Sequence, residues 1–179
     1  MVARFRRNRH GAVSVAFHAP EAALLRSLLE QTLEVLGEGE PGGGDALERA
    51  LGTGGARDRP TDPVLARLLP DAYSDDDEAA AEFRRFTEGD LREAKRSAAA
   101  TALATLERAE SKITLDGAEA QAWLGALNDV RLSLGIRLDI GEDFEADLAG
   151  MSRLDPRRSG YGIYAWLGWL QETLVRALW

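Results

Sequence analysis

The residues of this chain with the clearest chemical potential are an asparagine and an arginine one helical turn apart, Asn128 and Arg131. They fall between Trp123 and Leu138, where apolar residues recur at the spacing of one helix face. Arg131 falls inside this apolar stripe, and Asn128 falls at its edge. A guanidinium keeps its charge and needs a partner when it lies among apolar side chains. We therefore expect these two residues to form either a structural clamp or a site for an anionic group.

In the first interpretation, which is our main prediction, Arg131 is a buried clamp between the last two long helices, and Asn128 caps a neighbouring backbone segment. Glu172 is the preferred partner of Arg131. The other candidate partners are Gln171, Asp71 and Asp129. In the second interpretation, Asn128 and Arg131 line a pocket for an anionic ligand or for a carboxylate of a partner protein.

Other catalytic chemistry finds little support in the sequence. The chain has no cysteine and 2 histidines, which excludes a thiolate nucleophile, a cysteine-ligated metal and a thiol switch of its own. The glycines 37, 39 and 42 match the spacing of a dinucleotide-binding loop. However, they follow a predicted helix and are interleaved with glutamates and a proline, which would not suit a pyrophosphate. We predict no catalytic residue, no cofactor and no metal site, and hence that the protein is not an enzyme.

The charge of the chain limits the nucleic-acid interpretation but does not remove it. The net charge of −8 argues against a protein that coats nucleic acid through its overall field. The one strongly basic segment lies near the N-terminus and contains Arg4, Arg6, Arg7 and Arg9. These arginines either keep an exposed edge strand in solution or contact DNA phosphates, and the sequence leaves both interpretations open.

The helices and strands that the sequence predicts around these residues form an α+β fold that is predominantly α-helical. We expect one domain over residues 1–179, with a flexible glycine-rich insertion at about residues 37–60 that holds one short helix at 46–51. The predicted fold is a helical bundle with an N-terminal β-hairpin and with short strands flanking the 117–134 helix. The predicted helices span 20–36, 62–69, 75–88, 90–107, 117–134 and 161–179, the hairpin spans 4–17, and the flanking strands span 112–116 and 136–140.

The last predicted helix is apolar around most of its circumference, so it is either central to the core or shared with a second subunit. A homodimer would use Trp166, Trp169 and Thr173, which lie along one side of this helix. No stretch is long and apolar enough to be a signal peptide or a membrane span, which predicts a cytoplasmic protein.

One block of the chain, Leu-Asn-Asp-Val-Arg-Leu-Ser-Leu-Gly, ending at Gly135, combines polar residues with an apolar stripe in a way that generic helices do not share. It is the most specific of four blocks, and the others lie at 62–73, 91–98 and 164–172. Together these blocks resemble the actinobacterial AosR-type family of oxidative-stress regulators. The resemblance implies a non-enzymatic transcriptional regulator that acts through DNA, RNA polymerase or a sigma factor. The alternative is a dimeric adaptor or scaffold that binds proteins without direct DNA binding.

Overall fold

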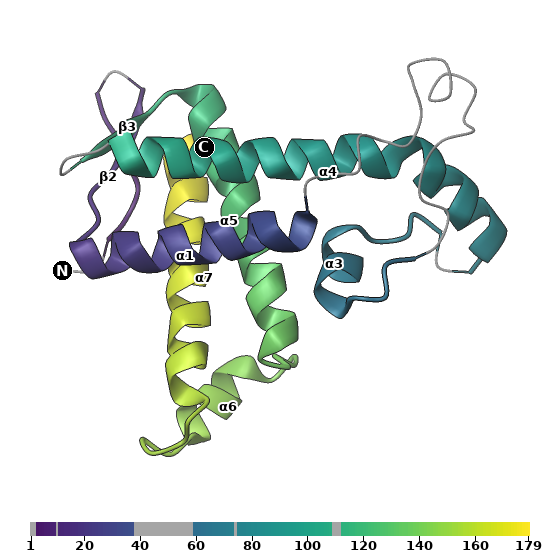
Figure 1. The fold of residues 1–179 in the computed structure, drawn as a ribbon. Coiled ribbons are helices and arrows are strands. Elements are labelled where there is room, and N and C mark those ends of the chain that lie inside the picture. The colour runs from purple at the N-terminus through teal and green to yellow at the C-terminus, as the bar shows by residue number, and fades with distance from the viewer. Residues whose placement is uncertain (1–2, 10, 38–58, 74, 109–111) are drawn as a thin grey trace.

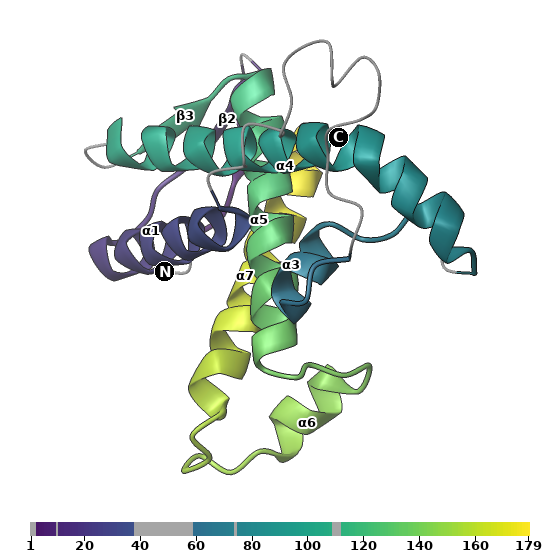
Figure 2. The same ribbon diagram turned by 45° about the vertical axis from the view of Figure 1, so that its right-hand side comes forward.

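The computed structural model describes residues 3–9, 11–37, 59–73, 75–108 and 112–179. Within these residues the fold is α+β and mostly helical, as the sequence predicted. Two helices, α1 (Ala19–Leu36) and α4 (Asp77–Arg108), lie side by side and cross a second pair, α5 (Gly117–Arg137) and α7 (Arg158–Leu178), as Figures 1 and 2 show. The expected short helix at 46–51 and the flexible insertion fall largely outside the described residues.

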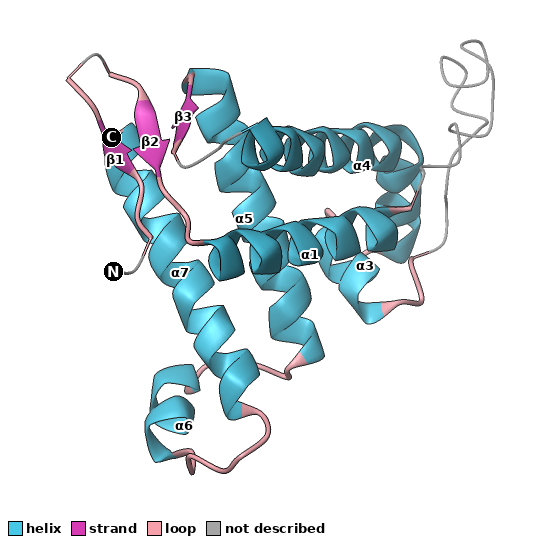
Figure 3. Cartoon of the chain, turned by 60° about the vertical axis from the view of Figure 1, so that its left-hand side comes forward, coloured by secondary structure: helices cyan, strands magenta, loops and turns pink. Residues whose placement is uncertain are grey.

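A three-stranded antiparallel sheet covers one end of the helices (Figure 3). Strands β1 (Arg6–Arg7) and β2 (Val13–Val15) form the predicted hairpin, in which Arg6 pairs with Ser14. The connecting turn is closed by Asn8, whose side-chain oxygen accepts a hydrogen bond from the backbone N–H of Ala12 at 3.0 Å. The third strand, β3 (Ile113–Leu115), pairs with β2. The sequence predicted this strand but not that it joins the hairpin.

Local signals correctly located the beginnings of several helices. Helix α3 (Pro63–Leu68) begins after Asp62, whose carboxylate accepts a hydrogen bond from the backbone N–H of Leu65 at 2.8 Å. Helix α5 begins after Asp116, which forms a capping box with Glu119. These caps satisfy backbone donors that have no partner within the first helical turn.

The predicted break at Gly89 is wrong, because α4 runs through it as a single helix of 32 residues. One glycine inside a helix costs only about 1 kcal/mol. The ion pair between Glu88 and Arg92, at i,i+4 spacing, spans the glycine and favours the continuous helix, and Glu88 also pairs with Arg84 one turn earlier. The sequence favours Ser74, three residues before Asp77, as the residue that caps the start of this helix, but Ser74 lies outside the described residues.

The predicted strand at 136–140 is also wrong. Helix α5 continues to Arg137, and the N–H of Leu138 still donates to the carbonyl of Leu134 at 3.0 Å. A strand here would have no edge to pair with, because the sheet lies at the opposite end of α5 (Figure 1). The stretch 141–160, predicted to be a loop, holds α6 (Phe144–Gly150).

Trp123 lies at the centre of the main core and is fully buried. Its ring stacks on Phe17 with centroids 5.8 Å apart, and its indole N–H donates to the Thr105 hydroxyl at 2.7 Å. Leu167, Leu170 and Leu174 of α7 are also fully buried, so the last helix is central to the core of this chain. A smaller cluster joins α1 to α3 through Leu36, Val64, Leu68 and Leu69.

Candidate functional site

Arg131 lies at the floor of an open groove between α5, α6 and α7. The groove has a volume of about 620 Å³, and its walls include Phe144, Tyr164 and Trp169. The guanidinium lies 5.0 Å above the centre of the Tyr164 ring. This distance is within the range of a cation–π interaction.

The partner of Arg131 is Gln171 and not Glu172, the partner we had preferred. Nη1 of Arg131 donates to the side-chain oxygen of Gln171 at 2.6 Å, whereas Glu172 pairs with Arg176 on its own helix at 2.5 Å. Nη2 of Arg131 lies 3.5 Å from the Tyr164 hydroxyl, and the buried Nε of Arg131 has no hydrogen-bond partner among the residues that the structure describes. Arg131 is thus held by neutral groups and by a ring, and no ion pair to it occurs among the described residues.

Two of the predicted residues have different surroundings. Asn128 is exposed and does not line the groove, so the structure does not bring it together with Arg131. Glu172 does line the groove, where its side chain is 55% exposed. The groove is therefore formed by Arg131 with residues of α6 and α7, which lie far away in the sequence.

The other two acids considered for Arg131 have their own cations. Asp129 on α5 pairs with Lys95 on α4, with Nζ and Oδ1 separated by 2.6 Å. Burial raises the pKa of Asp129, while the hydrogen bond and charge of Lys95 act in the opposite direction. This pair joins the two helices that contact each other most extensively, α4 and α5.

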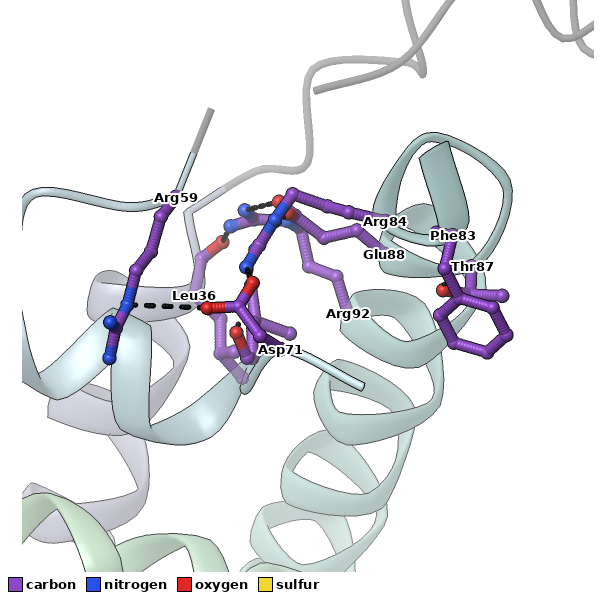
Figure 4. Close-up of polar contacts among 9 residues, drawn as sticks. Leu36, Arg59, Asp71, Phe83, Arg84, Thr87, Glu88 and Arg92 are labelled. Carbon is purple, nitrogen blue, oxygen red and sulfur yellow. Dashed lines mark hydrogen bonds and ion pairs between the residues drawn. The ribbon is translucent and has the colours of Figure 1, made fainter. Parts of the chain in front are cut away.

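Asp71 belongs to a separate buried charge cluster, shown in Figure 4. It pairs with Arg84, which also binds Glu88 at 2.8 Å, and both Arg84 and Glu88 are almost fully buried. Burial alone would lower the pKa of Arg84, but the hydrogen bonds to Glu88 and Asp71 outweigh it, so the pKa is raised. The cluster closes the space between α4 and the end of α3.

The same face of α4 holds the end of α1. Arg92 donates to the carbonyl of Leu36, and Arg96 donates to the carbonyl of Gly37. Cations stabilise a helix C-terminus because its last carbonyls lack partners and carry partial negative charge. The sequence expectations did not include this contact, although arginines at positions 84, 92 and 96 recur at multiples of four residues and could have indicated one charged face.

The hairpin arginines lie on the surface. Arg4, Arg6, Arg7 and Arg9 are exposed, and the ion pairs found in the described part of the chain include none of them. Phe5, which lies between two of them, is buried against the core and fixes the strand. The hairpin therefore presents its positive charge to solvent.

Of the three residues predicted for a dimer interface, only Trp169 is exposed, at 41%. Thr173 is buried, and its hydroxyl accepts a hydrogen bond from the backbone N–H of Phe5 at 3.1 Å. Trp166 packs against the main core of its own chain. Trp169 itself donates a hydrogen bond to the carbonyl of Ala3 at 3.3 Å.

The described residues contain neither a candidate metal site nor a candidate membrane span. No group of three or more His, Cys, Asp or Glu residues in this part of the chain could hold a metal ion. None of its helices is both long and apolar enough to cross a membrane.

Comparison with known proteins places the chain among named relatives. The family described as a domain of unknown function, DUF2017, matches residues 2–178. A Mycobacterium leprae protein that carries the name AosR is 40% identical over 88% of this chain and 78% of its own length. The proteins named oxidative stress regulator AosR in Mycobacterium tuberculosis and Mycobacterium bovis are each 37% identical over the same shares. No solved structure matches this chain.

Proposed function

The chain belongs to the AosR-type family of oxidative stress regulators, and from that premise we propose that it is a non-enzymatic regulator of transcription under oxidative stress. It acts through contacts with DNA, with RNA polymerase or a sigma factor, or with both. The observation that carries this proposal is the similarity to named regulators along 88% of the chain. Relatives named as regulators support a regulatory role for this chain and fit a protein without catalytic activity.

The exposed hairpin supports direct contact with DNA. A short antiparallel ribbon fits a DNA groove, and arginines at its surface can replace the counterions of the phosphates. The four arginines Arg4, Arg6, Arg7 and Arg9 concentrate positive charge in a chain whose net charge is −8. DNA would therefore approach this hairpin and be repelled by most of the remaining surface.

A gel-shift titration on promoters from the same genome, at several salt concentrations, tests the proposal that the protein binds DNA directly. Glutamine at all four hairpin arginines should reduce the slope of log affinity against log salt by about 0.9 for each lost phosphate contact. Glutamine at the exposed Arg67 and Arg137, far from the hairpin, is the control and should leave the slope unchanged. The proposal fails if the protein shifts no promoter DNA and also does not co-purify with RNA polymerase or a sigma factor.

The absence of cysteine shapes how such a regulator responds to oxidants. The chain contains no thiol, so an oxidant cannot switch it through disulfide formation within this sequence. We expect its binding to DNA to be the same after treatment with dithiothreitol or with dilute hydrogen peroxide. A response of DNA binding to dithiothreitol would contradict this view, whereas a response confined to the binding of a purified partner would locate the thiol sensor in that partner.

The second candidate function is a dimeric adaptor or scaffold, which the exposed Trp169 favours. Because Thr173 and Trp166 are used within the chain, a dimer through α7 would depend on Trp169 alone among the three predicted residues. Light scattering of the wild type should then give the mass of a dimer, and Trp169→Glu should give a monomer. A wild type that stays monomeric at high concentration excludes this dimer.

A further inference from the structure

We propose that the groove around Arg131 is a docking site for a protein segment that carries one carboxylate beside a bulky apolar side chain. The proposal deepens the regulatory function proposed above by giving the chemistry of the protein partner, and it rests on that function only for the presence of such a partner. Three features carry the argument: an arginine without a carboxylate, exposed apolar walls, and acids at the rim.

Arg131 is the feature that selects a carboxylate. Its guanidinium is partly buried and is bound by Gln171 and Tyr164, neither of which carries negative charge. Nε is shielded from solvent and has no partner in the described part of the chain. A guanidinium binds a carboxylate more strongly than it binds a neutral oxygen, because the hydrogen bonds are charge-assisted and can form in pairs. A carboxylate that enters the groove would supply the negative charge that Arg131 does not receive from the described residues of its own chain.

Gly168 of α7 lies directly beside this guanidinium. A β-carbon at this position would lie 3.6 Å from the guanidinium carbon of Arg131, an ordinary van der Waals distance, so α7 passes within contact distance of the arginine. On the other side, the Phe144 ring lies edge-on to Tyr164 with centroids 5.0 Å apart. The guanidinium thus lies against Tyr164 and Gly168 of α7, and Phe144 at the start of α6 extends the aromatic wall of the groove.

The walls of the groove select an apolar neighbour for that carboxylate. Trp169 and Val175 on α7 are 41% and 39% exposed, and both line the groove. Covering such surface contributes about 25 cal/mol for each Å² removed from water. A small ligand would leave these walls in contact with water, whereas small-molecule sites enclose about 70–90% of the ligand surface. A polypeptide segment lying along α7 covers them.

The acids at the rim argue against a polyanionic occupant. Glu145 and Glu172 both line the groove, and Glu172 is only partly neutralised by Arg176. A nucleic acid would bring several phosphates close to these carboxylates, whereas a protein segment with a single acid would bring only one negative charge, which pairs with Arg131. The charges of the groove therefore match a protein segment with a single acid rather than DNA, which the hairpin at the sheet suits better.

A peptide library displayed on phage is the probe that tests this proposal. Selection on the wild-type protein should enrich sequences in which Asp or Glu stands at a fixed distance from Leu, Phe or Trp. A synthetic peptide of the enriched sequence should bind at least about tenfold more weakly when its acid is replaced by the amide, since hydrogen bonds to charged groups are worth at least that factor. Raising the salt concentration should also weaken binding.

Variants of the protein assign the binding to this groove. Arg131→Gln should weaken peptide binding by about tenfold or more. Because Arg131 also helps to join α5 to α7, Val175→Asp provides a second test at the rim that leaves Arg131 intact. Its matched control is Ile136→Asp, at a residue of the same 39% exposure that does not line the groove. Val175→Asp should weaken binding, and Ile136→Asp should not.

Several results would overturn the proposal. These are a library without an enriched acidic and apolar motif, an enriched peptide that binds Arg131→Gln or Val175→Asp as tightly as the wild type, and equal effects of Val175→Asp and Ile136→Asp. A wild-type dimer that Val175→Asp converts to a monomer would instead assign the groove to a second copy of this chain. If peptide binding fails while promoter DNA is still shifted, the groove proposal falls and the regulatory function stands.

Discussion

Replacing Lys95 by methionine should destabilise the protein more than replacing Asp129 by asparagine, although both changes break the same ion pair. The two side chains differ in exposure, which is 17% for Lys95 and 4% for Asp129. In Lys95→Met the carboxylate stays buried without its cation, whereas in Asp129→Asn the long lysine side chain can extend toward water. Removing one partner of a fully buried pair costs about 3–5 kcal/mol. We expect about 3 kcal/mol for Lys95→Met and about 1 kcal/mol for Asp129→Asn.

The loss in free energy of unfolding caused by Lys95→Met should also depend on pH, and it should be smaller at lower pH. Burial raises the native pKa of Asp129 above the ordinary 3.8, so the native state binds this proton more tightly than the unfolded state does. The free energy of unfolding therefore rises as pH falls from the raised native pKa to the ordinary pKa of Asp129. Above the raised pKa, the buried carboxylate lowers the free energy of unfolding. Lys95→Met removes the charge that opposes this shift. The stability lost in Lys95→Met should become smaller between about pH 7.5 and about pH 5. The stability lost in Asp129→Asn should not become smaller, because protonation of the wild-type carboxyl stabilises only the wild type as pH falls.

Urea denaturation of the wild type, both single variants and the double variant at the two pH values measures these free energies. The double variant should be more stable than the sum of the single effects predicts, because it leaves no unpaired charge. Melting temperatures give a check, since about 1 kcal/mol shifts the melting temperature of a chain of this size by about 2–4 °C. Equal costs of the two single changes, or a Lys95→Met deficit that does not vary with pH, would refute the reasoning and mean that water reaches the pair.

Three further changes test other contacts by the same denaturation measurement. Arg84→Met should cost about 3 kcal/mol because it leaves the buried Glu88 with less positive charge, and a loss below about 1 kcal/mol would show that the cluster is hydrated. Thr105→Val should cost about 1–2 kcal/mol because the indole N–H of Trp123 loses its acceptor, and the tryptophan emission should change; an unchanged spectrum and stability would contradict the buried hydrogen bond. Asp62→Ala should cost about 1 kcal/mol through loss of the helix cap, and Asp62→Asn should restore most of it.

The sequence alone determined the elements whose signals lie within a few residues of one another. Asp62 and Asp116 cap helices through the backbone N–H three residues ahead, so their role needs no distant contact. The hairpin was predictable because Asn8 and Gly11 favour a tight turn between two short strands, and Gly11 takes a positive φ of 83°. Trp123 was placed in an apolar stripe by helical spacing, and the structure buries it completely.

Other features, such as the continuity of α4 and the end of α5, depended on how the helices and the sheet pack against one another. Gly89 ends a helix by local rules, but the Glu88–Arg92 ion pair across it and the packing of α4 against α1 and α5 keep α4 continuous. The alternation at 136–140 was compatible with a strand, but no strand edge lies beside it, and α5 continues instead. A strand needs a partner from elsewhere in the chain, and five residues of sequence carry no information about one.

The candidate site shows the same division. Its arginine could be recognised from the sequence, because a charged residue inside an apolar stripe breaks the pattern of an amphipathic helix. Its partner could not, because Gln171 and Glu172 are adjacent in the sequence and point about 100° apart around α7. Only the angle at which α7 packs on α5 decides which of them faces Arg131, and the structure chooses the neutral amide. That choice leaves the guanidinium without a carboxylate, and the packing of α6 then turns its surroundings into an open groove.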